Sequence, residues 1–162
     1  MRSVTKTPEP DPTAAVRDYY ERSAAREAER LGRPADGAVE WELHARALAE
    51  HLPPAPARIL DNGGGPGPWT RWLAERGYRV TLTDLSPASL DIARERVARA
   101  PRRHAANVEA VMEADERDLG AFPDGSFDAL LCLGPFYHLT TDTDRGRALQ
   151  EAHRVLRPCG LL

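Results

Sequence analysis

The run ILDNGGGPG (59–67) joins a short apolar segment to a glycine-rich turn, and a helical segment begins just after it. A turn without Cβ atoms lets the backbone come close to a ligand, and the N-terminus of the following helix favours negative charge such as a carboxylate. Gly63, Gly65 and Gly67 follow the spacing G-x-G-x-G. A dinucleotide site requires G-x-G-x-x-G, whose last position is Pro68 here, so the spacing speaks against NAD or FAD.

Asp84 is the second residue with evident chemistry. It ends the run YRVTLTD (78–84), which predicts a β-branched strand, and it lies 21 residues after Gly63. An acidic residue at this place of a βαβ unit can accept two hydrogen bonds from a ribose diol, opposite the glycine turn. Alone it would more often be a neighbour of a helix N-cap, since Ser86-Pro87 follows it. The combination with the glycine turn favours the ligand-binding interpretation.

Strands and helices alternate from residue 57 onward, and this alternation positions both features. Strands are predicted at 57–62, 78–84, 107–115 and 127–134, and helices at 69–76, 86–97 and 142–157. Such alternation argues for an α/β fold with a parallel sheet and right-handed crossovers. The carboxyl ends of parallel strands lie at one edge, where ligands bind in open α/β sheets.

The N-terminal third has a different character. Residues 1–12 are polar with three prolines and predict a disordered tail. Two helical stretches, Pro12 to about Leu31 and Asp36 to about Leu52, then form a helical cap over residues 13–54. The α/β domain occupies residues 55–162.

The C-terminal run RVLRPCGLL reads as the end of a helix, a turn and the first residues of a fifth strand. We therefore expect an incomplete domain in which strands five to seven are missing. The fourth strand would then form an exposed edge, and an unpaired edge invites self-association.

Four segments, taken in order, resemble successive motifs of class I S-adenosylmethionine (SAM)-dependent methyltransferases: LDNGGGPG, TLTDLSP, EADERDLGAFPDGSFDALLCLGPFYHL and RVLRPCG. More narrowly, they are similar to the bacterial small-molecule group related to ubiquinone and menaquinone biosynthesis methyltransferases. The resemblance runs from about Tyr19 to the end. It implies SAM as cofactor and a Rossmann-like sheet, for which we expect the strand order 3-2-1-4.

Carried over by position, the resemblance implies a set of contacts to the methionine part of SAM. Gly63, Gly65 and Gly67 would shape the loop around the methionine end. Asp61 would contact the amino group, directly or through water, and Leu133 would approach the methionine part from the end of the fourth strand.

The same resemblance implies contacts to the adenosine part. Asp84 would hold the ribose hydroxyls, with Leu85 against the adenine. Asp115 would accept from the adenine amino group, and the Glu116 backbone would meet the ring. Tyr20 matches an aromatic residue on an N-terminal helix that often closes over the cofactor.

Two residues depart from the family pattern. Asn62 stands where an aliphatic residue is usual, and a buried amide without partners costs about 1–3 kcal/mol. Cys159 replaces the usual glycine of the turn after the last helix, which would strain that turn if its φ is positive.

The acceptor side is predicted from GPFYHL (134–139), which follows the fourth strand at the ligand-binding edge. Tyr137 and His138 are therefore candidate catalytic residues. His138 could act as a general base for an oxygen or nitrogen nucleophile, or it could pack and hydrogen-bond locally. The other histidines lack ligand spacing, and the sequence predicts no metal site.

These features predict SAM-dependent methyl transfer to a small-molecule acceptor by in-line displacement. The alternative is a truncated SAM-binding module or remnant without catalytic activity. A nicotinamide-dependent oxidoreductase is excluded by the glycine spacing, and no hydride-transfer site is evident.

Length and composition set the remaining bounds. The 162 residues suit one domain. The net charge is −3 and the basic residues form no stripe along the sequence, so nucleic acid is not expected as a partner. No apolar run approaches the length of a membrane span, and no secretory signal is evident. Two cysteines without C-x-x-C spacing fit a reducing compartment, so we expect a cytoplasmic protein.

Overall fold

The computed structural model describes residues 12–30 and 37–162, and the predicted tail lies outside this range except for Pro12. Two N-terminal helices, α1 (Pro12–Arg30) and α2 (Ala38–His51), precede the α/β part. The strands are β1 (Arg58–Asn62), β2 (Arg79–Asp84), β3 (Val108–Glu113), β4 (Phe127–Leu131) and β5 (Leu156–Leu161). The later helices are α3 (Pro68–Glu75), α4 (Pro87–Arg99), the short α5 (Arg102–Ala105), the 3-10 turn η1 (Pro135–His138) and α6 (Asp142–Val155).

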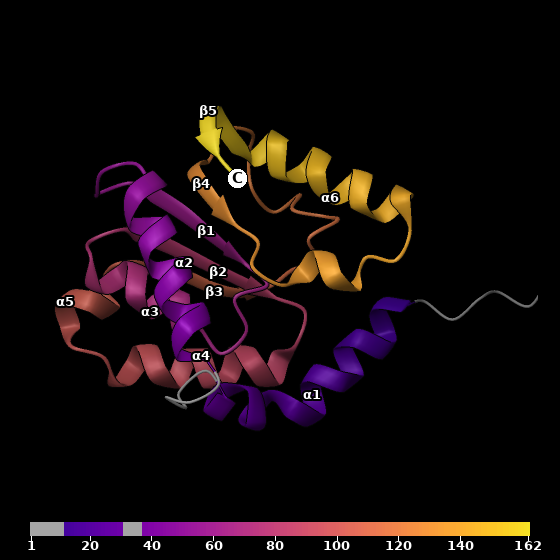
Figure 1. The fold of residues 1–162 in the computed structure, drawn as a ribbon, viewed down its shortest axis with the longest axis horizontal. Coiled ribbons are helices and arrows are strands. Elements are labelled where there is room, and N and C mark those ends of the chain that lie inside the picture. The colour runs from indigo at the N-terminus through magenta and orange to yellow at the C-terminus, as the bar shows by residue number, and fades with distance from the viewer. Residues whose placement is uncertain (1–11, 31–36) are drawn as a thin grey trace, which may run out of the picture.

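The five strands form one parallel sheet in the order β3-β2-β1-β4-β5. The predicted order of the first four strands is therefore confirmed. Figure 1 shows α6 beside β4 and β5, and α1 alongside α4 at the far end of the sheet. This is a Rossmann-like arrangement, in which the carboxyl ends of the central strands meet at one edge.

The prediction that the sheet stops at the fourth strand is wrong. β5 pairs with β4 at Phe127–Leu156 and again at Ala129–Leu161, so two steps along β4 match five along β5. The extra residues of the RPCG run bulge out between the two pairings, and a proline is tolerated there because an edge strand has one unpaired side. The strand thus begins directly at the end of α6.

The predicted exposed edge of the fourth strand is wrong for the same reason, so self-association through that edge loses its premise. β4 pairs with β1 on one side and with β5 on the other. The edge on this side belongs to β5, where Arg157, Pro158 and the bulge provide the features that natural sheets use against edge-to-edge pairing.

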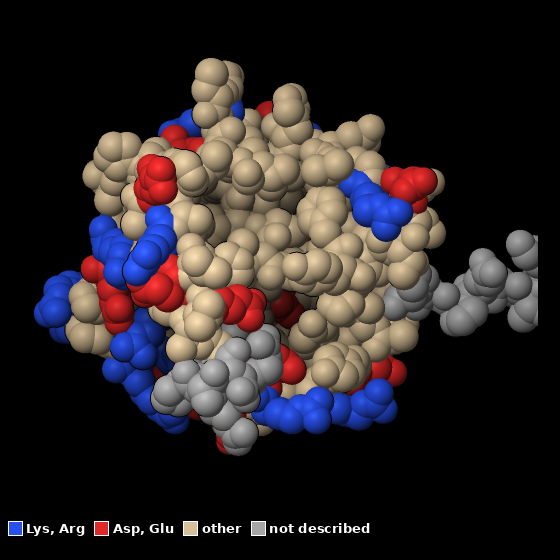
Figure 2. Space-filling view, viewed as in Figure 1, with Lys and Arg blue, Asp and Glu red and all other residues tan. Residues whose placement is uncertain are grey.

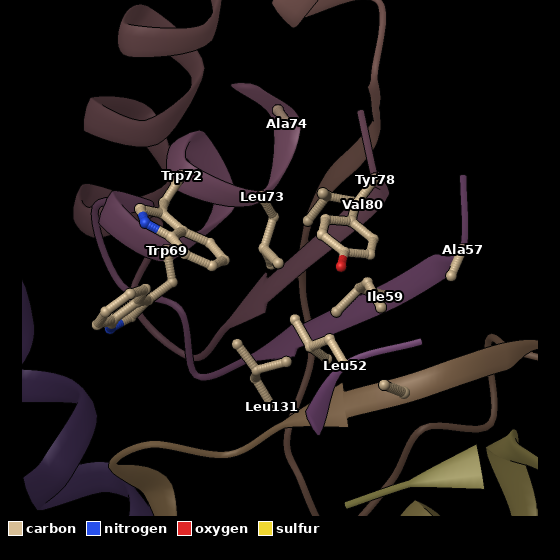
Figure 3. Packing of buried hydrophobic residues seen from close by; sticks show 11 residues of the cluster. Leu52, Ala57, Ile59, Trp69, Trp72, Leu73, Ala74, Tyr78, Val80 and Leu131 are labelled. Atoms are coloured by element: carbon tan, nitrogen blue, oxygen red, sulfur yellow. The ribbon is translucent and has the colours of Figure 1, made fainter. Parts of the chain in front are cut away.

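Hydrophobic side chains pack on both faces of the sheet, because neighbouring residues of a strand point to opposite sides. Ile59 packs on one face with Trp72 and Leu73 of α3, as Figure 3 shows. Leu60, the next residue, packs on the other face with Ala152 and Val155 of α6. Helices anchored in this way hold the strand ends at fixed positions. None of the helices in the described residues has the length and apolar character needed to cross a membrane.

The two departures from the family pattern have clear structural outcomes. Asn62 is buried, and its Oδ1 accepts a hydrogen bond from the Thr83 hydroxyl on the neighbouring strand at 2.9 Å. The amide thus has a polar partner in the interior. Cys159 has a φ of +66° and is the one non-glycine residue with positive φ in the described chain. The turn therefore keeps a conformation that suits glycine, with a cysteine in it.

Candidate functional site

The glycine-rich loop lies between β1 and α3 and folds over the end of β2. Gly63, Gly65 and Gly67 all have positive φ, at +69°, +54° and +76°. The backbone N–H groups of Gly63 and Gly64 both donate to the carbonyl of Thr83, at 2.8 and 3.1 Å. The loop is therefore fixed by the neighbouring strand, and its shape requires residues that adopt positive φ without strain.

Two of these glycines have opposite surroundings. A Cβ on Gly63 would lie 2.0 Å from Cγ of Pro135 in the turn η1. A Cβ on Gly65 would meet no atom within 4 Å. The loop thus packs closely against the β4 side, while its middle faces open space in which a ligand could approach the backbone.

Asp84 joins the loop to the end of β2. One of its carboxylate oxygens accepts from the Gly65 N–H at 2.8 Å, and the other accepts from the Ser86 N–H at 2.9 Å. A carboxylate has about four lone-pair sites, so two remain for a ligand. Burial is the largest cause acting on its pKa, which is raised above the usual range.

Asp61 lies at the end of β1, beneath the loop. Its Oδ2 accepts a 2.6 Å hydrogen bond from the Thr70 hydroxyl of α3, and a Cβ on Gly64 would collide with its carboxyl group. Burial raises the pKa of Asp61 to about 6; the hydrogen bonds from Thr70 oppose this rise, and the charge of Asp84 adds a little to it. The carboxyl group is thus held in place in a poorly solvated position.

A cavity of about 180 Å³ opens between the loop, the strand ends and the N-terminal helices. Figure 2 shows a hollow near the middle of one face with acidic atoms inside and beside it. The predicted site residues among its lining are Tyr20, Asp61, Gly63, Gly65, Asp84, Leu85, Glu116, Leu133 and His138. A second cavity of about 770 Å³ lies among α2, α3, α4 and α5, and none of the three carboxyl groups of Asp61, Asp84 and Glu116 lines it. The smaller cavity is therefore the candidate site.

Tyr20 and His138 meet at one side of this cavity. The Tyr20 hydroxyl lies 2.9 Å from Nε2 of His138, and the two rings meet edge to face with centroids 5.5 Å apart. Tyr20 belongs to α1 and His138 to η1, so the pair links the N-terminal helix to the segment after β4. His138 therefore has both a position at the cavity and a hydrogen bond to the N-terminal helix.

Asp115 and Glu116 differ sharply in their surroundings. Arg117 donates to both carboxylate oxygens of Asp115, and the same guanidinium donates to Asp144 of α6. Burial tends to raise the pKa of Asp115, but the Arg117 hydrogen bonds and charge outweigh it and the pKa is lowered. Asp115 is absent from the cavity lining, whereas Glu116 lines the cavity and is 6% exposed.

The structure does not bring Tyr137 or Gly67 to the cavity wall. Tyr137 is 88% exposed, although it precedes His138. Gly67 is the N-cap residue of α3. A Cβ added to it would approach the side chains of Leu82 and Ala93. Gly67 thus shapes the loop through packing, and Tyr137 lies outside the group that the fold assembles.

Three residues that the sequence did not single out help to build the site. Glu21 of α1 accepts from the Ser86 hydroxyl and the Ala88 N–H at the start of α4. Arg17, one turn earlier, donates to the carbonyl of Leu85 and pairs with Glu113. Thr70 holds Asp61. Only Thr70 had a local signal, since it lies in the first turn of the helix after the glycine loop.

Comparisons with known proteins agree with this geometry. A family model described as "Methyltransferase domain" matches residues 59–160. The chain is 38% identical over 127 residues to a demethylmenaquinone methyltransferase of Thermus thermophilus, which covers 76% of this chain and 52% of that protein. It is 36% identical over 128 residues to a glycine/sarcosine N-methyltransferase of Parasynechococcus marenigrum, covering 76% of this chain and 42% of that protein.

A solved structure gives the same picture. The crystal structure of a SAM-dependent methyltransferase from Methanosarcina mazei superimposes with a TM-score of 0.61 at 29% identity, covering 71% of this chain and 54% of that one. The chain thus spans about half the length of the relatives that it matches.

Proposed function

The chain belongs to the class I SAM-dependent methyltransferase family, and from that premise we propose that it binds SAM in the acidic cavity and transfers the methyl group to a small-molecule acceptor. The hydrogen bond from the Gly65 N–H to Asp84 carries this proposal. It fixes the glycine loop, which receives the methionine end, against the carboxylate that receives the ribose hydroxyls.

The residues present fit SAM in three respects. The open side of Gly65 leaves backbone accessible without a Cβ in the way. Asp61 offers a fixed carboxyl group beneath the loop, suited to an amino group. Asp84 retains lone pairs for a diol after its two backbone hydrogen bonds. We propose that Leu85 lies against the adenine and that Leu133 borders the methionine part, since both line the cavity.

When bound, SAM supplies a methyl group on a sulfonium, which is already a good electrophile. The protein has to hold the acceptor in line behind that group and keep water out. Tyr20 and His138, which close one side of the cavity, are suited to this task.

We propose that His138 also removes a proton from an acceptor whose nucleophile is an alcohol or a protonated amine. Nε2 of His138 already lies at hydrogen-bond distance from the Tyr20 hydroxyl. The proton is therefore taken either by Nδ1 or by Nε2 after Tyr20 has moved aside. Tyr137 has no part in this proposal, because it lies away from the cavity wall.

The names of two relatives support a small acceptor. One is a demethylmenaquinone methyltransferase and the other a glycine/sarcosine N-methyltransferase, so related domains serve both a quinone and an amino acid. Because the chain spans about half the length of these proteins, methyl transfer by this chain has to be measured separately from cofactor binding.

The experiment is a calorimetric titration of SAM and S-adenosylhomocysteine into the purified chain and its Asp84→Ala variant, followed by transfer assays with labelled SAM. We expect binding in the parent chain and a loss of at least about 30-fold in affinity in the variant, because two charge-assisted hydrogen bonds worth about 1.5–3 kcal/mol each lose their acceptor. Asp91→Ala, which removes an exposed carboxylate of α4, is the matched control. A folded parent chain that binds neither compound would overturn the proposal, whereas binding without any transfer would indicate a cofactor-binding module.

A further inference from the structure

The wall of the cofactor cavity carries many acidic groups. The carboxylic acid and histidine residues of the described lining are Glu27, Glu40, His44, Asp61, Asp84, Glu116 and His138. Five of these are acidic, and neither lysine nor arginine is among the described residues of the wall. A cavity lined by negative charges has a strengthened negative electrostatic potential inside it, which attracts positively charged ligands.

Of the three carboxyl groups at the strand ends, those of Asp61, Asp84 and Glu116, that of Glu116 holds no other described element in place. Asp61 holds Thr70, and Asp84 holds the glycine loop. Glu116 forms no salt bridge within the described residues, although its side chain is buried. Burial of a carboxylate without an ion pair is costly. At a ligand cavity, a positively charged group of the ligand can offset this cost.

The position of Glu116 points the same way. It follows β3, and it lines the cavity together with Asp61 at the end of β1 and Asp84 at the end of β2. Burial raises the pKa of Glu116, the charges of Asp115 and Asp84 add to this rise, and its own backbone N–H and the charge of Arg117 oppose it. The three carboxyl groups therefore approach the cavity from the ends of β1, β2 and β3.

SAM and its product differ in charge at the reacting centre. The sulfonium of SAM is positively charged, whereas the sulfur of S-adenosylhomocysteine is a neutral thioether. The two compounds are otherwise nearly the same in shape and in hydrogen-bonding groups. A negative potential in the cavity therefore acts on the difference between them, while packing and hydrogen bonds act on both alike.

We propose that Glu116 is a charge-selecting residue of the cofactor site, whose carboxylate adds to those of Asp61 and Asp84 and favours the sulfonium form over the neutral product. This inference rests on the proposed function. It goes beyond the position of Glu116 in the motif, which implied only a backbone contact to the adenine ring. It also gives the chain a means of releasing product, because methyl transfer removes the charge that the site attracts.

The test compares two ligands in matched variants. SAM and S-adenosylhomocysteine are titrated by calorimetry at pH 8 and low ionic strength into the parent chain, Glu116→Gln and Glu116→Ala. Asp118→Asn is the control, since it removes a carboxylate two residues away that lies outside the cavity wall and accepts from the Gly120 N–H. Circular dichroism establishes that each variant is folded.

We expect Glu116→Gln to weaken SAM about five- to tenfold and S-adenosylhomocysteine less than twofold, the size expected for one partly screened charge several ångströms from another. Glu116→Ala should change the ratio in the same direction, and Asp118→Asn should leave it unchanged. Equal weakening of both ligands, or an unchanged ratio, would overturn the inference while leaving SAM binding intact. A parent chain that binds neither ligand would overturn the proposed function together with it.

Discussion

The Thr70 hydroxyl donates a 2.6 Å hydrogen bond to the Asp61 carboxylate, and both side chains are almost fully buried. This contact ties the end of β1 to the first turn of α3 across the glycine loop. It places a carboxyl group where a ligand can reach it, at a cost to the folded state that depends on pH.

Asp61→Asn should stabilise the protein at neutral pH and leave its stability nearly unchanged in acid. Burial raises the pKa of Asp61 from 3.8 to about 6, so the folded state binds this proton more tightly than the unfolded state does. The stabilising contribution is complete below about pH 4 and is lost as pH rises to about 6. Above pH 6 the variant should gain about 1–3 kcal/mol, since one pKa unit corresponds to about 1.4 kcal/mol.

Urea unfolding of both proteins at pH 4 and pH 8 measures this difference. The asparagine Oδ1 can still accept from Thr70, so the variant keeps its packing. A difference between the two proteins that does not grow with pH would contradict the prediction. We expect the same variant to bind SAM more weakly, because it lacks the negative charge.

Gly63→Ala should be strongly destabilising. The residue has a φ of +69°, and a Cβ would lie 2.0 Å from Pro135. Left-handed backbone costs about 1–2 kcal/mol for a residue with a side chain, and overpacking adds about 1–3 kcal/mol. Urea unfolding should therefore show a loss of about 2–5 kcal/mol.

Gly146→Ala provides the matched control for this substitution. Gly146 lies within α6, and an added Cβ meets nothing within 4 Å. Alanine should stabilise the helix there by about 0.5–1 kcal/mol. If both substitutions changed stability by the same amount, the close packing of the loop against Pro135 would not be the cause.

Much of this architecture follows from local sequence patterns. The β-branched run before Asp84 and the apolar run before Gly63 predict adjacent parallel strands, and the right-handed crossover rule leaves few ways to arrange them. The glycine spacing predicts the loop because positive φ at alternate positions restricts the residue type. These inferences need no knowledge of contacts between distant residues.

The sequence indicated only the first residues of a fifth strand, and the extent and pairing of β5 were not predictable in the same way. Its residues Pro158 and Gly160 have low strand propensity, and its pairing with β4 comes from the docking of α6 on the sheet. A Cβ on Gly160 would lie 3.2 Å from the Asp128 carbonyl of β4. That close approach is a property of the folded chain and leaves no periodic signal in the sequence.

The identity of the cavity-facing carboxylate also depends on distant contacts. The motif places Asp115 and Glu116 side by side, and the resemblance to the family implies that Asp115 accepts from the adenine amino group. Arg117 draws Asp115 into a network with Asp144 of α6, which leaves Glu116 at the cavity. The Tyr20–His138 pair, 118 residues apart, likewise arises only when α1 docks across the strand ends.

Cys159→Gly should stabilise the turn between α6 and the second pairing of β5. Cys159 has a φ of +66° and is exposed, so its side chain contributes little packing to offset the backbone strain. The gain should be about 0.5–1 kcal/mol, because the strain of about 1–2 kcal/mol is partly offset by the greater freedom of glycine in the unfolded chain. Cys159→Ala keeps the Cβ and should bring no such gain in a thermal unfolding series. Equal effects of glycine and alanine would show that backbone conformation is not the cause.

Tyr20→Phe and His138→Gln should separate the two roles of the pair at the cavity. Tyr20→Phe removes the hydroxyl that lies 2.9 Å from Nε2 of His138 but keeps the edge-to-face ring contact. If His138 is the base, His138→Gln should lower kcat about 100-fold or more, within the usual range for a general base, with less than a threefold change in the Kd for SAM.

Tyr20→Phe should instead retain most of kcat, since it keeps the imidazole and the ring contact with it. A transfer assay across pH 5.5–9 with any acceptor found in the screens measures both effects. His44→Gln is the matched control, because His44 also lines the cavity but lies on α2, against Trp69. An unchanged rate and pH profile in the His138→Gln variant would show that the histidine only holds α1 in place through Tyr20. The protein would then act by positioning the acceptor alone.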